Sequence, residues 1–165
     1  ITIIAPRHID RSENIFSLAK KLNLNAQILN KDETIYKDVE VVIINYFGAL
    51  QNYFKHSKSV FIGKSILKKF KNNGGQNPVE AAKLNCKIYH GPYVCNFDDI
   101  YAIFAKNNIS QKVEDHHELA ENLTQDITKS NEKNLEISDS IKSLEQTTLK
   151  DTMTLVNNFV IHGNK

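Results

Sequence analysis

The run Val41-Val42-Ile43-Ile44, which leads into Asn45-Tyr46-Phe47-Gly48, indicates the fold class. All four residues from Val41 to Ile44 are apolar, which is typical of a strand buried on both faces of a parallel sheet. Further short β-rich runs flank it, separated by stretches of helical periodicity, and the expected strands lie at 1–5, 26–29, 60–62, 87–89 and 111–113. This alternation predicts an α/β fold built on a doubly wound parallel sheet.

Apolar spacing marks two of the intervening helices. The first has Ser12 as its candidate N-cap, and the second is expected over residues 96–104. The helical spacing of the first helix is carried by Ile15, Leu18, Ala19 and Leu22.

The character of the chain changes after residue 113. Residues 114–165 are polar at first and become apolar again near the end, with apolar positions at roughly helical spacing. They predict two or three helices, the last of which packs on residues 1–113 or on a neighbour outside this chain. A partly disordered tail after Thr124 is the alternative. Because the chain enters a strand directly at Ile1, without an initiator Met, we expect a piece of a longer protein.

The composition is that of an ordinary globular chain and gives no sign of nucleic-acid binding, a disulfide framework or a membrane span. Of 165 residues, 41% are hydrophobic and 24% are charged, and the net charge is +2. This balance gives no electrostatic indication of nucleic-acid binding. The two cysteines, Cys86 and Cys95, fit free thiols in a reducing compartment. No apolar run approaches the roughly 20 residues needed to cross a bilayer.

The first candidate site follows the first expected strand, because ligands of parallel sheets bind at the carboxyl ends of strands. Pro6 ends that strand and places Arg7 at the edge of the sheet. The guanidinium of Arg7 has five N–H donors, which suit bidentate binding of phosphate or carboxylate. A solvated surface arginine is the alternative.

Two further strand ends carry glycine-containing turns. Gly48 stands at the start of an expected helix, where exposed N–H groups favour anions. A plain tight turn explains Gly48 equally well. Gly63-Lys64-Ser65 precedes Lys68, Lys69 and Lys71, a basic loop that either meets phosphate or an anionic membrane surface or is simply solvated.

The strongest local signal is Gly74-Gly75-Gln76-Asn77-Pro78-Val79-Glu80-Ala81-Ala82. The two glycines permit positive φ and close backbone approach. Asn77 is expected as the N-cap of a helix, Pro78 as its first residue and Glu80 as its third. The Glu80 carboxylate can accept two hydroxyl hydrogen bonds, as from a ribose. The alternative is a capping box, in which Glu80 only accepts the Asn77 N–H.

The histidines and the missing motifs narrow the chemistry. His90 is expected to be a structural residue at a strand end, and His116 and His117 are expected to face different ways, so that no metal site is predicted. The sequence lacks Gly-x-Gly-x-x-Gly, a Walker motif and a nucleophile-base set.

Taken in order, these pieces resemble the 3-deoxy-D-manno-octulosonic acid (Kdo) transferases of lipopolysaccharide synthesis. The resemblance covers roughly residues 1–125. The pieces that carry it are Ala5-Pro6-Arg7-His8, Phe47-Gly48-Ala49-Leu50, Val60-Phe61-Ile62-Gly63-Lys64-Ser65, Gly74-Gly75-Gln76-Asn77-Pro78-Val79-Glu80-Ala81-Ala82 and Gly91-Pro92-Tyr93-Val94-Cys95-Asn96-Phe97.

The resemblance implies one Rossmann-like half of a GT-B glycosyltransferase. Residues 1–113 would be the nucleotide-sugar-binding domain that holds the CMP part of CMP-Kdo, and residues 114–165 would be helices that pack on it and on a missing N-terminal domain. The implied donor-binding residues are Pro6, Arg7, Phe47, Gly48, Ala49, Asn77, Pro78, Val79 and Glu80, and a second group of donor contacts is Ser65, Gly74, Gly75 and Gln76.

The resemblance also implies what lies outside this chain. The general base would be an acidic residue of the N-terminal domain, which also binds the lipid A precursor, so no catalytic residue is expected here. The full-length protein would act at the cytoplasmic face of the bacterial inner membrane, while this chain itself would be soluble. CMP-Kdo is the expected donor substrate, and no cofactor, metal or nucleic acid is implied.

The sequence departs from the family at several positions. An acidic residue usually stands at Ala49, histidine at Gln76, and a second glycine at Lys64, while proline usually stands at Ile9. Lys64 either supplies a cation for the Kdo carboxylate or fills space. Two rival functions stay open: a GT-B transferase or epimerase with another sugar nucleotide, and a non-catalytic nucleotide-binding module whose helical tail binds a partner.

Overall fold

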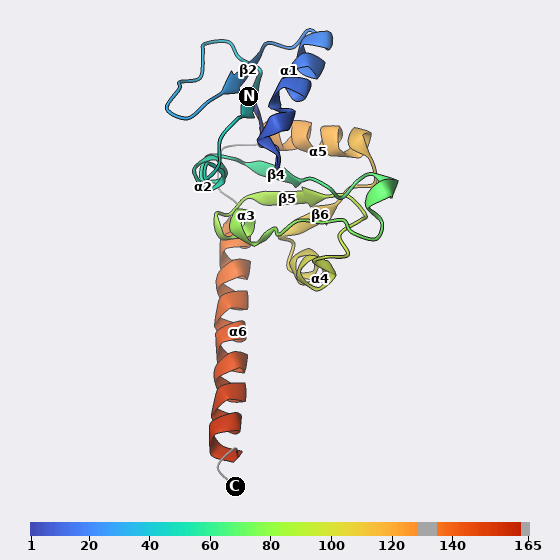
Figure 1. Ribbon diagram of the computed structural model, residues 1–165. Helices are drawn as coiled ribbons and strands as arrows, with labels where there is room; N and C mark the ends of the chain where they lie inside the picture. Colours follow the sequence, from blue (N-terminus) through green and yellow to red (C-terminus); the bar gives the residue numbers. More distant parts are fainter. Residues whose placement is uncertain (129–134, 163–165) are drawn as a thin grey trace. The chain divides into compact units, whose positions relative to one another are not determined.

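The computed structural model describes residues 1–128 and 135–162. The chain divides into two compact units, Ile1–Tyr53 and Phe54–Lys165 (Figure 1). The helices of residues 114–165 belong to the second unit.

The first unit is a parallel sheet of β1 (Thr2–Ile4), β2 (Ala26–Leu29) and β3 (Val41–Ile44). The strand order is β1-β3-β2, so that β3 is central, and all four of its residues are buried. A 3-10 turn (η1, Ile9–Arg11) leads into α1 (Ser12–Lys21). The continuously apolar run therefore forms the double-faced buried strand that it predicts.

Each face of this first sheet has its own core. Ala19 of α1 packs with Ala26, Val41 and Ile43 on one face. The opposite face is covered by the segment that leads into α2 (Leu50–Phe54), and its buried residues are Leu29, Val42, Ile44 and Ala49. Side chains alternate between the two faces because successive residues of a strand point in opposite directions.

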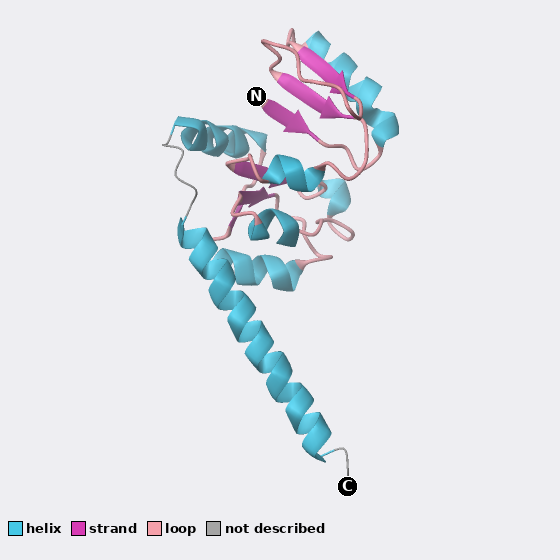
Figure 2. Cartoon of the chain, turned by 90° about the vertical axis from the view of Figure 1, so that its left-hand side faces the viewer, coloured by secondary structure: helices cyan, strands magenta, loops and turns pink. Residues whose placement is uncertain are grey.

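The second unit contains the parallel sheet β4 (Ser59–Ile62), β5 (Lys87–His90) and β6 (Ser110–Lys112), with β5 in the centre. The 3-10 turn η2 (Lys68–Phe70), α3 (Val79–Lys83), α4 (Asp98–Lys106), α5 (His116–Thr128) and α6 (Leu135–His162) complete it. Helix α5 lies on one face of the sheet, and α3 and α4 lie on the other (Figures 1 and 2). The main core joins α3, α4 and β5.

The parallel α/β architecture is confirmed, and two details differ from expectation. The strands of the described residues form two three-stranded sheets instead of one doubly wound sheet, because apolar runs specify where strands occur but not which strands lie adjacent. Ser12 is not an N-cap: Arg11 precedes the helix without a side-chain cap. The 3-10 turn already gives Ser12 helical angles, φ −59° and ψ −42°, and its buried Oγ has no hydrogen-bond partner among the described residues.

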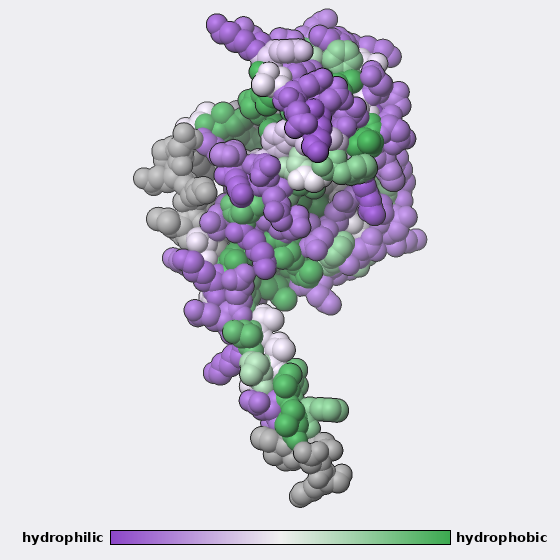
Figure 3. Space-filling model, turned by 60° about the vertical axis from the view of Figure 1, so that its left-hand side comes forward, coloured by the Kyte–Doolittle hydropathy of each residue, from purple (hydrophilic) through white to green (hydrophobic). Residues whose placement is uncertain are grey.

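The described part of residues 114–165 contains the two helices α5 and α6, where two or three were expected. Helix α5 continues past Thr124 to Thr128, and residues 129–134 lie outside the described residues. Ile141 of α6 is 9% exposed and joins the core of the second unit. Leu155 and Phe159, by contrast, are 71% and 80% exposed. Figure 3 shows apolar side chains gathered along this end of the helix. Within the described residues, no helix combines the length and apolarity that crossing a bilayer requires.

Candidate functional site

The glycine pair at residues 74 and 75 packs directly against its own chain. A Cβ on Gly74 would lie 2.3 Å from the carbonyl oxygen of Tyr93, and a Cβ on Gly75 would lie 2.8 Å from the Cα of Val94. Gly75 also has φ +87° and donates its N–H to the carbonyl of Lys64 at 2.8 Å. Both positions therefore require glycine for close packing of the loop on the strand ends, whether or not a ligand approaches.

Helix α3 begins one residue later than expected. The residue before it is Pro78, which is buried, and Val79 is its first residue. Asn77 nevertheless acts at this helix end, because its Oδ1 accepts the Val79 N–H at 3.0 Å. Its side chain thus satisfies one of the N–H groups that a helix start leaves without an intrahelical partner.

Glu80 is the second residue of α3 and is exposed. No described residue hydrogen-bonds or ion-pairs with its carboxylate. The capping box, in which Glu80 accepts the Asn77 N–H, is therefore absent from the described structure. The helix is only five residues long, so its dipole is weak, and recognition at this end depends on individual groups.

Ser65 joins the ends of two neighbouring strands. Its side chain is completely buried. The Oγ donates to the carbonyl of Ile62 at 2.6 Å and accepts the N–H of Gly91 at 2.9 Å. The Ser65 carbonyl also accepts the Tyr93 N–H at 2.8 Å. These bonds use the hydroxyl within the chain and make Ser65 a support for the loop.

His90 is the structural residue that its position predicts. It is 5% exposed, its Nδ1 lies 2.8 Å from the Gly91 carbonyl oxygen, and its ring packs on Tyr101 with centroids 4.2 Å apart. Burial lowers the pKa of His90, because an imidazolium loses hydration there. The Tyr101 hydroxyl in turn donates to the Gln76 carbonyl at 3.0 Å. The buried pair His90 and Tyr101 therefore supports the candidate loop through the bond to Gln76.

The candidate residues of the first unit are open to ligands. Arg7 is exposed, and no described residue bonds to its guanidinium. Phe47 is 74% exposed. Gly48 has φ +86°, and a Cβ there would meet nothing within 4 Å. Pro6 is half-buried, whereas Ala49 is 5% exposed and packs in the core, so that its side chain is not available to a ligand.

The described residues do not gather three metal-ligating side chains at one place. The expectation that His116 and His117 face different ways is wrong. Their rings lie 4.1 Å apart between centroids at a tilt of 37°. Both side chains lean together at the first turn of α5, where the chain emerges from a bend.

The structure also shows a polar cluster that sequence spacing did not indicate. The carboxylate of Asp126 on α5 accepts hydrogen bonds from Ser59 at 2.6 Å, Tyr89 at 2.8 Å and Lys87 at 3.0 Å. Ser59 and Lys87 are the first residues of β4 and β5. The cluster therefore lies at the amino ends of the strands, opposite the carboxyl ends that carry the candidate loop, and it anchors α5.

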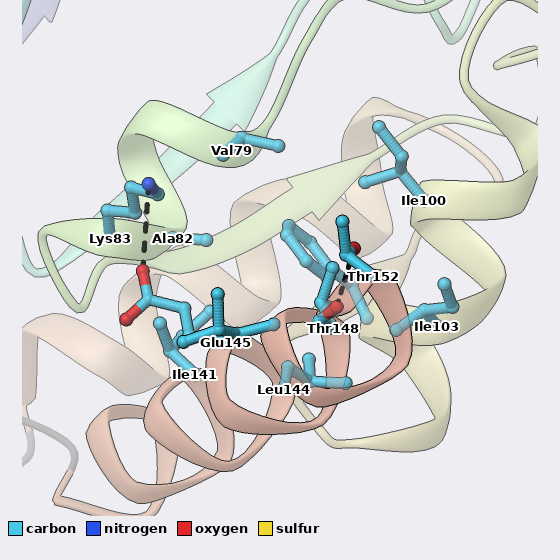
Figure 4. A pocket seen from close by; sticks show the side chains of 12 residues that line it. Val79, Ala82, Lys83, Ile100, Ile103, Ile141, Leu144, Glu145, Thr148 and Thr152 are labelled. Carbon is cyan, nitrogen blue, oxygen red and sulfur yellow. Dashed lines mark hydrogen bonds and ion pairs between the residues drawn. The ribbon is translucent and has the colours of Figure 1, made fainter. Parts of the chain in front are cut away.

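An apolar cavity of about 590 Å³ lies where α6 packs on α3 and α4 (Figure 4). Val79, Ile100 and Leu144 are among the residues that line it. At its edge, Lys83 of α3 and Glu145 of α6 form an exposed ion pair of 3.6 Å. Val79, one of the expected donor contacts, thus has its side chain in this cavity and only its backbone on the loop side.

Comparison with known proteins gives relatives at modest identity. The chain is 27% identical over 122 residues to 3-deoxy-D-manno-octulosonic acid transferase of Rickettsia prowazekii, which covers 74% of this chain and 25% of the relative. It is 28% identical over 138 residues to a bifunctional glycosyltransferase/methyltransferase of Fusobacterium nucleatum, covering 81% and 20%. The chain thus spans about a quarter of the length, or less, of these curated relatives. No protein-family model matches it.

The solved C-terminal CMP-Kdo binding domain of WaaA from Acinetobacter baumannii is similar in structure. The TM-score is 0.74 at 23% sequence identity, and the match covers 86% of this chain and 72% of that one. This likeness confirms the fold that the sequence resemblance implies. The chain is homologous to the Kdo transferases, and it has the α/β fold of the C-terminal CMP-Kdo binding domain of WaaA.

Proposed function

We propose that this chain is the donor-binding part of a glycosyltransferase that transfers Kdo from CMP-Kdo to a lipid A precursor. The observation that carries the proposal is Glu80. Its carboxylate is exposed and has no partner among the described residues, at the head of a helix that follows a tightly packed glycine pair. In a chain homologous to Kdo transferases, such a carboxylate is suited to accept the two ribose hydroxyls of CMP.

In the second unit, the proposed contacts divide between side chains and backbone. Glu80 accepts the ribose hydroxyls, and Asn77 contributes its exposed amide. Pro78 and Val79 have side chains turned to the interior, so they act through the backbone. The remaining donor contacts are assigned to the backbone of Gly74 and Gly75 and to the half-buried Gln76. Ser65, which is completely buried, supports this loop and does not touch the donor itself.

In the first unit, Arg7 is the proposed phosphate ligand. Its guanidinium is free to donate two parallel N–H groups to phosphate oxygens. Gly48 leaves space beside the backbone, which lets a nucleotide approach its N–H. Phe47 offers an exposed ring, and Pro6 and the backbone of Ala49 flank these groups. Helix α2 has five residues, so the positive charge of Arg7, and not a helix dipole, supplies the main attraction.

These contacts define the part of the reaction that the chain serves. The bond between the anomeric carbon of Kdo and the phosphate oxygen breaks, and CMP leaves with the electron pair. Arg7 stabilises the charge that develops on this phosphate. The acceptor hydroxyl forms the new bond to the anomeric carbon and gives its proton to a general base.

We place that base, the lipid A precursor site and the membrane contact in an N-terminal domain of the whole protein, at the cytoplasmic face of the inner membrane. Two observations support this assignment. The chain matches only about a quarter of the Rickettsia relative. The end of α6 exposes apolar residues, among them Leu155 and Phe159, which would be covered by such a domain.

Isothermal titration calorimetry on this chain tests the proposal. CMP is expected to bind and UDP to bind much more weakly or not at all. Glu80→Gln should weaken CMP by about tenfold, because a neutral amide accepts hydroxyl hydrogen bonds less strongly than a carboxylate. The same substitution should change the affinity for 2′-deoxy-CMP less. Glu121→Gln is the matched control, since Glu121 is also an exposed helical carboxylate of the second unit.

Three results would count against the proposal. Binding of UDP with no binding of CMP would assign the chain to a different sugar nucleotide. This alternative has one observation in its favour, namely the relative in Fusobacterium that is named only as a glycosyltransferase/methyltransferase. Binding of neither nucleotide would overturn the donor-binding role. Equal affinities in Glu80→Gln and wild type would remove Glu80 from the site.

A further inference from the structure

Lys64 has an unusual backbone conformation at the carboxyl end of β4. Its φ is +59°. Of the non-glycine residues with positive φ among those described, the others are Asn23, Asp32, Asp38, Asn85 and Asn108. Asparagine and aspartate tolerate this left-handed conformation because their short polar side chains bond to nearby backbone, whereas lysine has no such compensation. Lys64 is therefore the strained member of this set.

The surrounding loop holds Lys64 in this conformation. Its carbonyl accepts the Gly75 N–H at 2.8 Å, which ties it to the glycine pair of the candidate site. The next residue, Ser65, is completely buried and hydrogen-bonded to the ends of both β4 and β5. Residues held in sparsely populated conformations persist only where their surroundings over-determine them, and they cluster at ligand sites.

The ammonium group of Lys64 is not used within the described structure. Its side chain is half-buried, and no described residue forms a hydrogen bond or ion pair with it. The neighbouring lysines are more exposed than Lys64. Lys68, Lys69 and Lys71 are exposed, and the Lys69 ammonium lies 5.2 Å above the ring of Phe70. Lys64 is thus a half-buried lysine whose backbone is bonded to the loop that precedes Glu80 and whose ammonium has no partner among the described residues.

We propose that the Lys64 ammonium binds the carboxylate of the sugar acid in the donor and selects donors that carry one. This proposal rests on the proposed function and deepens it. In CMP-Kdo the anomeric carbon carries both the phosphate ester and a carboxylate, so the donor presents a second negative charge beside the phosphate. An ammonium with three N–H donors pairs well with such a carboxylate. A CMP molecule without the sugar lacks this partner.

The test compares CMP with CMP-Kdo by calorimetry in wild type and three variants. Lys64→Asn removes the charge and keeps a residue that tolerates positive φ. It should lower the affinity for CMP-Kdo by about tenfold and leave the affinity for CMP within about twofold of wild type. Lys64→Arg keeps the charge and should restore most of the affinity for CMP-Kdo. Lys68→Asn removes an exposed charge nearby and should leave both ligands unchanged.

Each outcome decides between roles for Lys64. If Lys64→Asn loses affinity for CMP and CMP-Kdo alike, Lys64 acts on the phosphate. If it loses affinity for neither, Lys64 is a solvated side chain. Both results overturn the proposal. Lys64→Asn should also melt at or above the wild-type temperature, because asparagine relieves backbone strain. If wild type binds neither ligand, the proposed function itself fails. If it binds CMP but gains nothing from the sugar, only the role of Lys64 fails.

Discussion

The buried hydroxyl of Tyr89 on β5 donates a hydrogen bond of 2.8 Å to the carboxylate of Asp126 on α5. Ser59 and Lys87 bond to the same carboxylate, whose side chain is 10% exposed. Burial alone would raise the pKa of Asp126, but the three donors and the charge of Lys87 together lower it. The hydroxyl of Tyr89 has its pKa raised, first by burial and then by this carboxylate. One carboxylate thus holds α5 on the second sheet.

Asp126→Asn should lower the free energy of unfolding by about 2 kcal/mol, the range of a charge-assisted hydrogen bond. Asp126 has its pKa lowered in the folded chain, so its contribution is fully present above the unfolded value of about 4 and is lost as pH falls below it. Urea unfolding at several pH values should show the gap between wild type and variant shrinking below about pH 4.

Asp151→Asn is the control for this pair of measurements, because Asp151 is an exposed residue of α6. It should change the free energy of unfolding by less than about 0.5 kcal/mol at every pH. A gap between wild type and Asp126→Asn that stays constant down to pH 2 would contradict the role of the carboxylate charge.

Gly91→Ala should destabilise the chain strongly, and Gly63→Ala should not. A Cβ on Gly91 would lie 2.3 Å from the Ser65 carbonyl oxygen and 2.4 Å from the Ile66 Cα, whereas a Cβ on Gly63 would meet nothing within 4 Å. Forcing backbone apart in this way costs about 1–3 kcal/mol or more. Thermal melts of the two variants check the difference, and equal melting temperatures would show that the turn after β5 moves freely.

Arg7→Ala should weaken CMP binding by about 1.5–3 kcal/mol, the contribution of hydrogen bonds to a charged group. Arg7→Lys should retain only part of the wild-type affinity, because an ammonium lacks the planar geometry with which a guanidinium donates two parallel hydrogen bonds. Arg11→Ala is the control, because Arg11 is also exposed in the first unit. Titration calorimetry at low salt measures all three. Unchanged affinity in Arg7→Ala would identify Arg7 as a solvated surface residue.

Helix α6 should contribute to stability through its first turns and not through its last. Ile141→Ala should lower the free energy of unfolding by about 2–3 kcal/mol, since Ile141 is 9% exposed in the core. Phe159→Ala should change it by less than about 0.5 kcal/mol, because Phe159 is 80% exposed. Chemical denaturation checks both. A large loss in Phe159→Ala would show that this end of the helix is covered in solution.

Much of the candidate site was predictable, and its internal bonding was not. Pro6-Arg7 and Phe47-Gly48 do stand at the ends of parallel strands, and Glu80 does head a helix. The choice between a capping box and a free carboxylate at Glu80 required coordinates. The use of the Ser65 hydroxyl inside the chain also depends on Gly91, which is 26 residues away, and no local pattern reports such a bond.

The sequence by itself determined the strands, their parallel direction and the relationship to Kdo transferases, because runs such as Val41 to Ile44 are apolar on both faces and the site pieces keep their order. Only the tertiary structure decided which strands pair, why Gly74 and Gly75 must lack a Cβ, and how Asp126 finds partners 67 and 37 residues away in Ser59 and Tyr89. The physical reason is that the tendency of a residue to be buried in a strand depends mainly on its own side chain and can therefore be read from the sequence. Adjacency and polar pairing arise only when distant segments pack together.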